Sequence, residues 1–116
     1  MLKQKEKEKN WEAMKAFLQD CDIVVDNGNT TIFKAQGVYI AKTKGKTVRM
    51  PSCEMSYGTN TYGSMSLCIP ALDEKKCFTE FSTDFNEFKY ENGVLKITGK
   101  DTFGTGKGDY EINLFP

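Results

Sequence analysis

The feature that most constrains the fold is an Asn-Gly step, Asn92-Gly93, between two short stretches of alternating apolar residues. An Asn-Gly pair supplies the two positive φ angles of a type I′ turn, so the step predicts a β-hairpin with a two-residue loop. Such a loop pairs Tyr90 with Leu95. Two residues further from the turn it pairs Phe88 with Ile97, which places four apolar side chains on one face. The turn and the hydrophobic pattern therefore predict the same hairpin.

Two further glycine steps predict two more hairpins, at Asn27-Gly28 and at Lys44-Gly45. The second of these turns is expected to place Ala41 opposite Val48, again with one apolar face. Alternating apolar residues predict the remaining strands, which cover residues 55–57, 64–69, 78–82 and 110–115.

The N-terminal part of the chain carries a helical pattern. Trp11, Met14 and Leu18 recur at the spacing of one helix face, and Asn10 is suited to an N-cap. These residues predict a helix over residues 10–20. The Lys/Glu-rich residues 1–9 either form a flexible charged extension or continue the helix backward. The apolar face of the helix is expected to pack on the sheet, the alternative being that Trp11 and Phe17 dock a partner.

Together these elements predict an α+β fold that is mostly β. An N-terminal helix precedes an antiparallel meander of about eight strands over residues 21–116, which form a curled sheet or a small barrel. A chain of 116 residues can bury one hydrophobic core, so a single domain over residues 1–116 is expected. In outline this arrangement resembles calycin-like barrels, but the chain carries no motif of that family, so no function follows from the resemblance.

The chain contains no histidine, which excludes Ser-His-Asp and Cys-His mechanisms within it. Two carboxylate pairs remain as candidates for acid–base chemistry, Asp84 with Glu87 and Asp109 with Glu111. Both are expected to be surface acids, because one pair flanks a turn and the other alternates with apolar residues. The glycine-rich stretch 99–108 lacks the spacing of a phosphate-binding loop. The sequence therefore predicts a protein that is not an enzyme and uses no cofactor.

Charge and cysteine content bear on location and partners. Sixteen basic and sixteen acidic residues cancel, so no overall field directs the chain to nucleic acid or to a membrane. No apolar run is long enough for a signal or a membrane span, so a cytoplasmic protein is expected. The four cysteines show no metal-binding spacing, and they are expected to be reduced and without a metal. The alternative is a cross-strand disulfide between Cys53 and Cys68.

Two local features predict binding. Residues 27–53 contain no acid and five basic residues, a composition suited to an anionic partner or to the protection of a sheet edge. Residues 56–64 are rich in Tyr, Gly, Ser and Asn, as recognition loops and ordinary hairpin tips both are. A straight strand between the two turns would hold them about 35–40 Å apart, so they are separate candidates. The candidate binding residues are Lys42, Lys44, Lys46, Arg49, Tyr57, Asn60 and Tyr62.

Three classes of function follow from these observations. The leading prediction is a small non-enzymatic protein that binds a protein or another macromolecule, for example an inhibitor encoded by a phage or mobile element. The alternative is a carrier of a small apolar ligand inside a β-barrel. The residues expected to line that cavity are Phe33, Tyr39, Phe81, Phe88 and Tyr90. An enzyme that acts through carboxylates is the third class.

Overall fold

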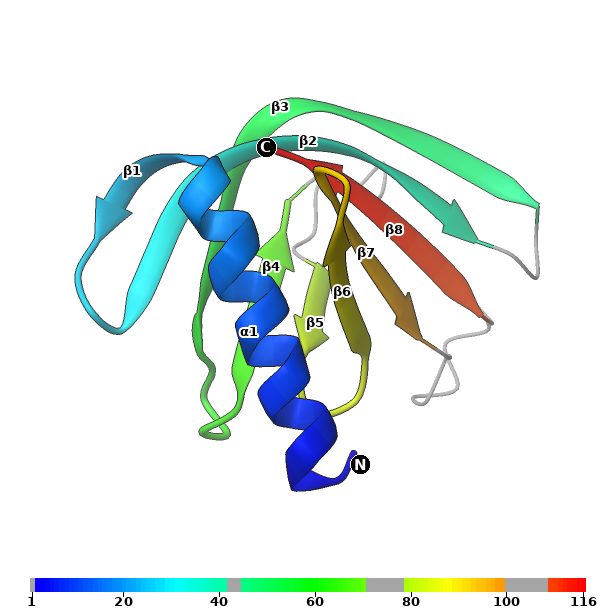
Figure 1. Ribbon diagram of the computed structural model, residues 1–116. Helices are drawn as coiled ribbons and strands as arrows, with labels where there is room; N and C mark the ends of the chain where they lie inside the picture. Colours follow the sequence, from blue (N-terminus) through cyan, green and yellow to red (C-terminus); the bar gives the residue numbers. More distant parts are fainter. Residues whose placement is uncertain (1, 42–44, 71–78, 100–108) are drawn as a thin grey trace.

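The computed structural model describes residues 2–41, 45–70, 79–99 and 109–116. Within these ranges one helix precedes a strongly curled, antiparallel half-barrel sheet, and the helix lies across its open side (Figure 1). This confirms the predicted α+β fold that is mostly β. The elements are α1 (Gln4–Asp20), β1 (Asp22–Asp26), β2 (Thr30–Ala41), β3 (Lys46–Thr59), β4 (Met65–Ile69), β5 (Thr79–Ser82), β6 (Glu87–Glu91), β7 (Val94–Gly99) and β8 (Tyr110–Phe115).

The strands form two runs of hairpins that meet at the centre of the sheet. The order is β5-β4-β3-β2-β8-β7-β6, and the junction is the pairing of the last strand, β8, with β2. Strand β1 pairs with the same edge of β2 as β8 does, but further along it. It opposes Thr31–Lys34, whereas β8 opposes Gln36–Ala41. Among the described residues, β1 pairs with β2 alone, so its other edge is free.

The register confirms the Asn92-Gly93 hairpin. Asn92 and Gly93 have φ angles of 54° and 76°, as a type I′ turn requires. The two predicted cross-strand pairs are both present, Tyr90 with Leu95 and Phe88 with Ile97. Because this turn and its flanking pattern are local in sequence, they could be predicted together.

The register predicted for the strands on either side of the Lys44-Gly45 turn is wrong by two residues. Ala41 lies opposite Lys46, and Tyr39 lies opposite Val48. Ala41 and Lys46 are the last pair before the turn, so four residues connect the strands where a two-residue turn was expected. A shift of two residues leaves every side chain on its predicted face. Residues 42–44 of this turn lie outside the described residues.

The helix begins earlier than the predicted residue 10. It starts at Gln4, so residues 4–9 continue the helix backward and are not a flexible extension. The start is held against the β5–β6 turn, because the backbone N–H of Leu2 donates to the carbonyl of Asp84 at 2.8 Å. Asn10 is consequently inside the helix, where its side chain is buried, and it is not the N-cap.

The core lies between α1 and the inner face of the sheet. Met14 and Phe17 are fully buried, and the rings of Phe17 and Phe33 meet edge to face at 5.8 Å. Trp11 is half-buried and donates its indole N–H to Thr83 Oγ1 at 3.1 Å. The helix face predicted from the sequence thus packs on the sheet. The other buried apolar residues are Phe33, Ala35, Met50, Met55, Tyr57, Leu67, Ile69, Phe81, Phe88, Leu95, Ile97, Ile112 and Leu114.

Substitution of Gly93 by valine is expected to lower the free energy of unfolding by at least about 1 kcal/mol. A Cβ at this position would have no atom within 4 Å, so the cost comes from backbone strain at positive φ and not from a clash. Urea denaturation measures the change. The control is Gly93→Asn, which tolerates a positive φ and should cost less. Equal midpoints for Gly93→Val and the native chain would contradict the type I′ turn.

Candidate functional site

The structure describes only part of the predicted basic cluster. Lys42 and Lys44 lie outside the described residues, as does the side chain of Lys46. Arg49 is on β3 and is exposed. The prediction of a basic binding turn therefore stays a prediction.

The tyrosine-rich loop does not present the three residues that were expected to bind together. Tyr57 is only 7% exposed and faces the core, because it continues the inward alternation that begins with Met55. Burial, followed by the negative charge of Asp84, raises the pKa of Tyr57 to about 12. Its assignment to a binding surface is therefore wrong. Tyr62 is 92% exposed at the tip.

Asn60 has a structural role in this turn. Its side-chain oxygen accepts hydrogen bonds from the backbone N–H groups of Tyr62 and Ser64, both at 3.0 Å. Its amide nitrogen donates to a carboxylate oxygen of Glu80 at 2.6 Å. These contacts are typical of a hairpin tip. They explain why an asparagine occupies this position without any role in binding another molecule.

The two predicted binding turns lie at opposite ends of β3. This strand runs without a break from Lys46 to Thr59, and Figure 1 shows its ends on opposite sides of the molecule. The structure therefore does not bring Arg49 and the basic turn together with Tyr62. They remain separate surfaces.

The aromatic residues expected to line a ligand cavity contribute to the core. Phe33, Phe81 and Phe88 are at most 3% exposed, and Tyr39 and Tyr90 are half-buried. The rings of Phe33, Tyr39, Phe81 and Tyr90 make edge or stacked contacts with other aromatic rings. The observed pairs are Phe17–Phe33, Phe17–Tyr90, Phe81–Tyr110 and Tyr39–Tyr110.

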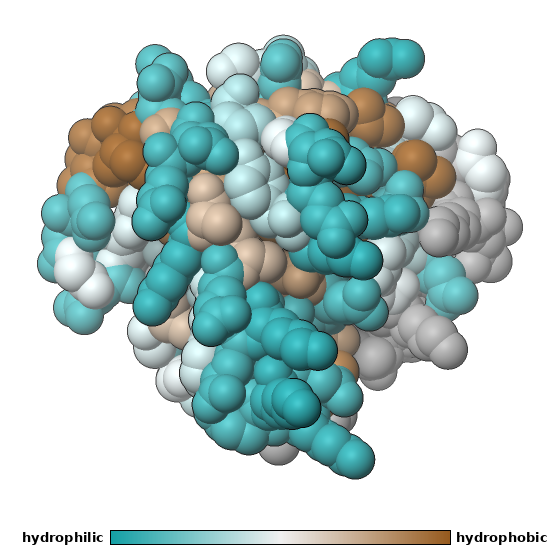
Figure 2. Space-filling model, viewed as in Figure 1, coloured by the Kyte–Doolittle hydropathy of each residue, from teal (hydrophilic) through white to brown (hydrophobic). Residues whose placement is uncertain are grey.

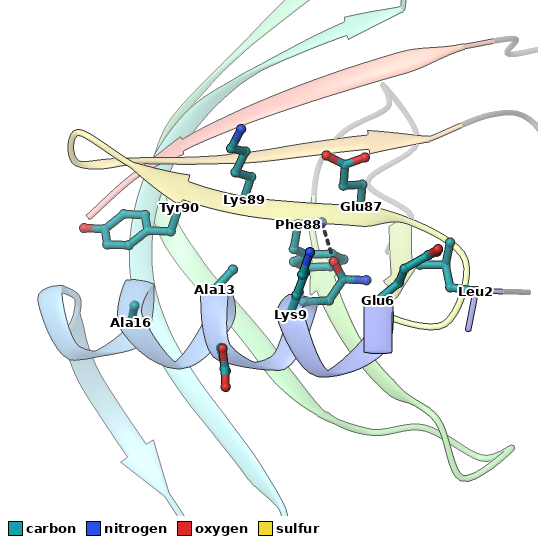
Figure 3. A pocket seen from close by; sticks show the side chains of 11 residues that line it. Leu2, Glu6, Lys9, Ala13, Ala16, Glu87, Phe88, Lys89 and Tyr90 are labelled. Carbon is teal, nitrogen blue, oxygen red and sulfur yellow. Dashed lines mark hydrogen bonds between the residues drawn. The ribbon is translucent and has the colours of Figure 1, made fainter. Parts of the chain in front are cut away.

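A groove of about 600 Å³ lies between α1 and the edge strand β6 (Figure 3). The small side chains of Ala13 and Ala16 leave space beside Phe88 and Tyr90, whereas the rim carries charges of both signs. Asn10, a buried lining residue, donates to the carbonyls of Thr83 and Asn86 and accepts the Phe88 N–H at 2.9 Å, so its side chain is used by the protein's own backbone. The groove is thus a ligand-sized space whose one buried polar lining residue already has its hydrogen-bond partners within the protein.

The proposed Cys53–Cys68 disulfide is wrong. Cys68 lies opposite Ser56, three residues along β3 from Cys53, and both thiols are free. That offset alone separates the two Cα atoms by about 10 Å, beyond the reach of a disulfide. Cys21 is also a free thiol, and Cys77 lies outside the described residues.

The most exposed apolar run of the described chain is on β1. Ile23, Val24 and Val25 are 46%, 44% and 47% exposed. Figure 2 shows a group of hydrophobic residues at the end of the molecule where β1 lies in Figure 1. We call these three residues with the flanking Asp22 and Asp26 the β1 patch. An edge strand that exposes consecutive aliphatic residues is a surface on which another chain can pack.

The shape of the β1 patch results from a break in the register at Val24. Ile23 opposes Phe33 and Val25 opposes Ile32, so Val24 is an additional residue in a β-bulge. In a regular strand of a half-covered sheet, alternate side chains would be buried. Here no residue of β1 is buried, because the helix covers the inner face nearer to β6.

Comparisons of the chain with protein-family models, with curated proteins and with solved structures give no match. Over the described ranges, no three Cys, Asp or Glu side chains gather closely enough to hold a metal ion. The same part of the chain has no helix with the length and apolar character needed to cross a membrane. Function must therefore be argued from the surface geometry.

Proposed function

We propose that the protein is a non-enzymatic binding protein that recognises a partner protein through the β1 patch. The observation that carries the proposal is the exposure of three consecutive aliphatic side chains, at 44–47%, on a strand whose outer edge pairs with no other described strand. Single exposed apolar residues are normal on protein surfaces, whereas a contiguous apolar group marks interaction sites.

The patch suits a protein better than a small molecule. A free strand edge offers backbone N–H and C=O groups beside the aliphatic side chains, and the edge of another strand is complementary to both. Neither described groove includes a residue of β1. An inhibitory role, an anionic partner at the basic turn, and a small apolar ligand carried inside the sheet all stay predictions.

Replacing Val24 by lysine is expected to weaken partner binding, so that the amount of partner captured by the variant falls at least tenfold. A charge at the centre of the patch would have to be desolvated when the partner packs on it. The measurement is affinity capture from cell extract with quantitative mass spectrometry, after circular dichroism has shown that the variant is folded.

Phe85→Lys is the matched control, because Phe85 is 46% exposed and lies in the turn between β5 and β6. A protein that is retained by the native chain and by Phe85→Lys, but lost with Val24→Lys, is the expected partner. If every captured protein is retained equally by all three chains, the β1 patch is not the binding surface.

A further inference from the structure

Given the proposed function of the β1 patch, we infer that its partner is an extended protein segment with aliphatic residues between two basic residues. Three features of the patch indicate this partner chemistry: the acids at its ends, the faces on which they lie, and the charges around them.

The first feature is that an exposed carboxylate ends the aliphatic run on each side. Asp22 precedes Ile23 and Asp26 follows Val25, and both acids are exposed. Strand geometry places them about 13 Å apart. A partner strand that covers the aliphatic residues must bring its own residues opposite both carboxylates, where basic side chains are favourable and acidic ones are not.

The second feature is that the bulge distributes these groups over both faces of the strand. Cross-strand neighbours share a face, and Ile23 is paired with the buried Phe33, so Ile23 is on the inner face. The same reasoning applies to Asp26. It pairs with Thr31 on β2, which in turn pairs with the buried Tyr57 on β3, so Asp26 is also on the inner face.

Asp22 and Val25 occupy the outer face, opposite Lys34 and Ile32. Apart from the bulge residue Val24, each face of β1 therefore presents one aliphatic residue and one acid. A partner lying flat on one face would meet only one such pair, whereas a strand added along the free edge presents side chains to both. This geometry favours an extended segment.

The third feature is the acidity of the surroundings. Lys34 lies between Asp22 on β1 and Glu54 on β3 in one cross-strand row, so two carboxylates share its single charge. Asp20 adds a further carboxylate where α1 ends. Burial, followed by the negative charges of Asp20 and Asp22, raises the pKa of Cys21 to about 11, which agrees with a negative potential here.

A second copy of this chain is a poor occupant. The antiparallel pairing that brings the two aliphatic runs together puts Asp22 level with Asp26 of the other copy at both ends, but the bulge places these two residues on opposite faces, so the faces of the two copies do not match. The pairing would also bring four carboxylates of like charge to one edge. The acids and the bulge thus disfavour self-pairing, and both are known means by which edge strands avoid it. The same acids leave the edge complementary to a basic segment.

The test is a titration of the ¹⁵N-labelled full chain with two synthetic peptides, followed by amide shifts in NMR spectra. The basic peptide is acetyl-Lys-Val-Val-Lys-amide, whose two lysines lie on opposite faces of an extended strand as Asp22 and Asp26 do, and the acidic one replaces both lysines by glutamate. We expect the basic peptide to move the amides of residues 22–26 and to bind at least about fivefold tighter than the acidic one. High salt should reduce this ratio.

A double variant, Asp22→Asn with Asp26→Asn, should bring the affinity ratio close to one. Asparagine keeps the side-chain oxygen that accepts the Gly28 N–H at 3.1 Å, so the turn is retained. The matched control is Glu87→Gln with Glu91→Gln, which neutralises two exposed acids at the same spacing on the edge strand β6 and should leave the ratio unchanged.

Equal binding of the two peptides at residues 22–26 would overturn the basic partner while the patch remained a binding surface. No shift at these residues with either peptide would overturn the inference, and the capture experiment with Val24→Lys would still decide the proposed function. Shifts at residues 22–26 that depend on protein concentration alone would show self-pairing and would also overturn it.

Discussion

Replacing Asn10 by alanine is expected to lower the free energy of unfolding by about 3–5 kcal/mol. The Asn10 side chain is buried, and its nitrogen donates to the carbonyls of Thr83 and Asn86 at 2.8 and 2.7 Å. Its oxygen accepts the backbone N–H of Phe88 at 2.9 Å. Alanine would leave three backbone groups without these partners in a buried place, each at a cost of about 1–3 kcal/mol before relaxation. Urea denaturation followed by circular dichroism measures the loss.

Two variants show whether the effect comes from these hydrogen bonds. Gln19→Ala removes an exposed polar side chain from the same helix and should change the free energy of unfolding by less than about 0.5 kcal/mol. Asn10→Asp keeps the acceptor for Phe88 but turns a carboxylate toward two carbonyls, so it should be strongly destabilising. An Asn10→Ala chain as stable as Gln19→Ala would show that the side chain does not fasten the helix.

Replacing Phe17 by alanine is expected to cost about 3–5 kcal/mol, by loss of buried area and by the cavity left behind. Phe17 is fully buried, and the centroid of its ring lies 5.8 Å from that of Phe33 and 5.6 Å from that of Tyr90. Phe17 thus holds α1 on the sheet by apolar packing, whereas Asn10 holds it by hydrogen bonds. The same denaturation experiment measures the change, with the exposed Lys15→Ala as control.

The two attachments should act independently. Asn10 and Phe17 are about 10 Å apart along the helix axis, and residues at such distances usually contribute additively to within about 0.5 kcal/mol. A small effect of Phe17→Ala would contradict the packing of α1 on the sheet. A double variant far less destabilised than the sum would show that the helix detaches as a unit in either single variant.

The elements that depend on local signals could be predicted from the sequence. The Asn92-Gly93 turn fixes both the loop and the pairing of its strands, and the alternation in residues 110–115 fixes a strand. The pairing of β8 with β2 could not be predicted, because alternation identifies a strand without identifying its neighbour. Gly37 shows what that pairing demands, since a Cβ there would lie 2.5 Å from the carbonyl oxygen of Asn113.

The candidate site was predicted less well than the fold. Composition favoured Tyr57 as a loop residue, but β3 extends to Thr59 and its alternation turns Tyr57 inward. The β1 patch was visible in the sequence only as the aliphatic run Ile23–Val25. Whether such a run is covered depends on which strand lies at the edge and where the helix packs, and both are properties of the assembled sheet.

The attachment of the first helix to a late turn has a consequence for biosynthesis. On the ribosome α1 is made before the segment containing Thr83, Asn86 and Phe88, to which Asn10 is fastened. The central strand β2 must likewise wait for β8, which follows it in the chain by about seventy residues. The inner face of the nascent half-sheet therefore stays uncovered until residues 83–115 have left the ribosome. Until then its apolar side chains are exposed to aggregation and accessible to chaperones that shield apolar surface.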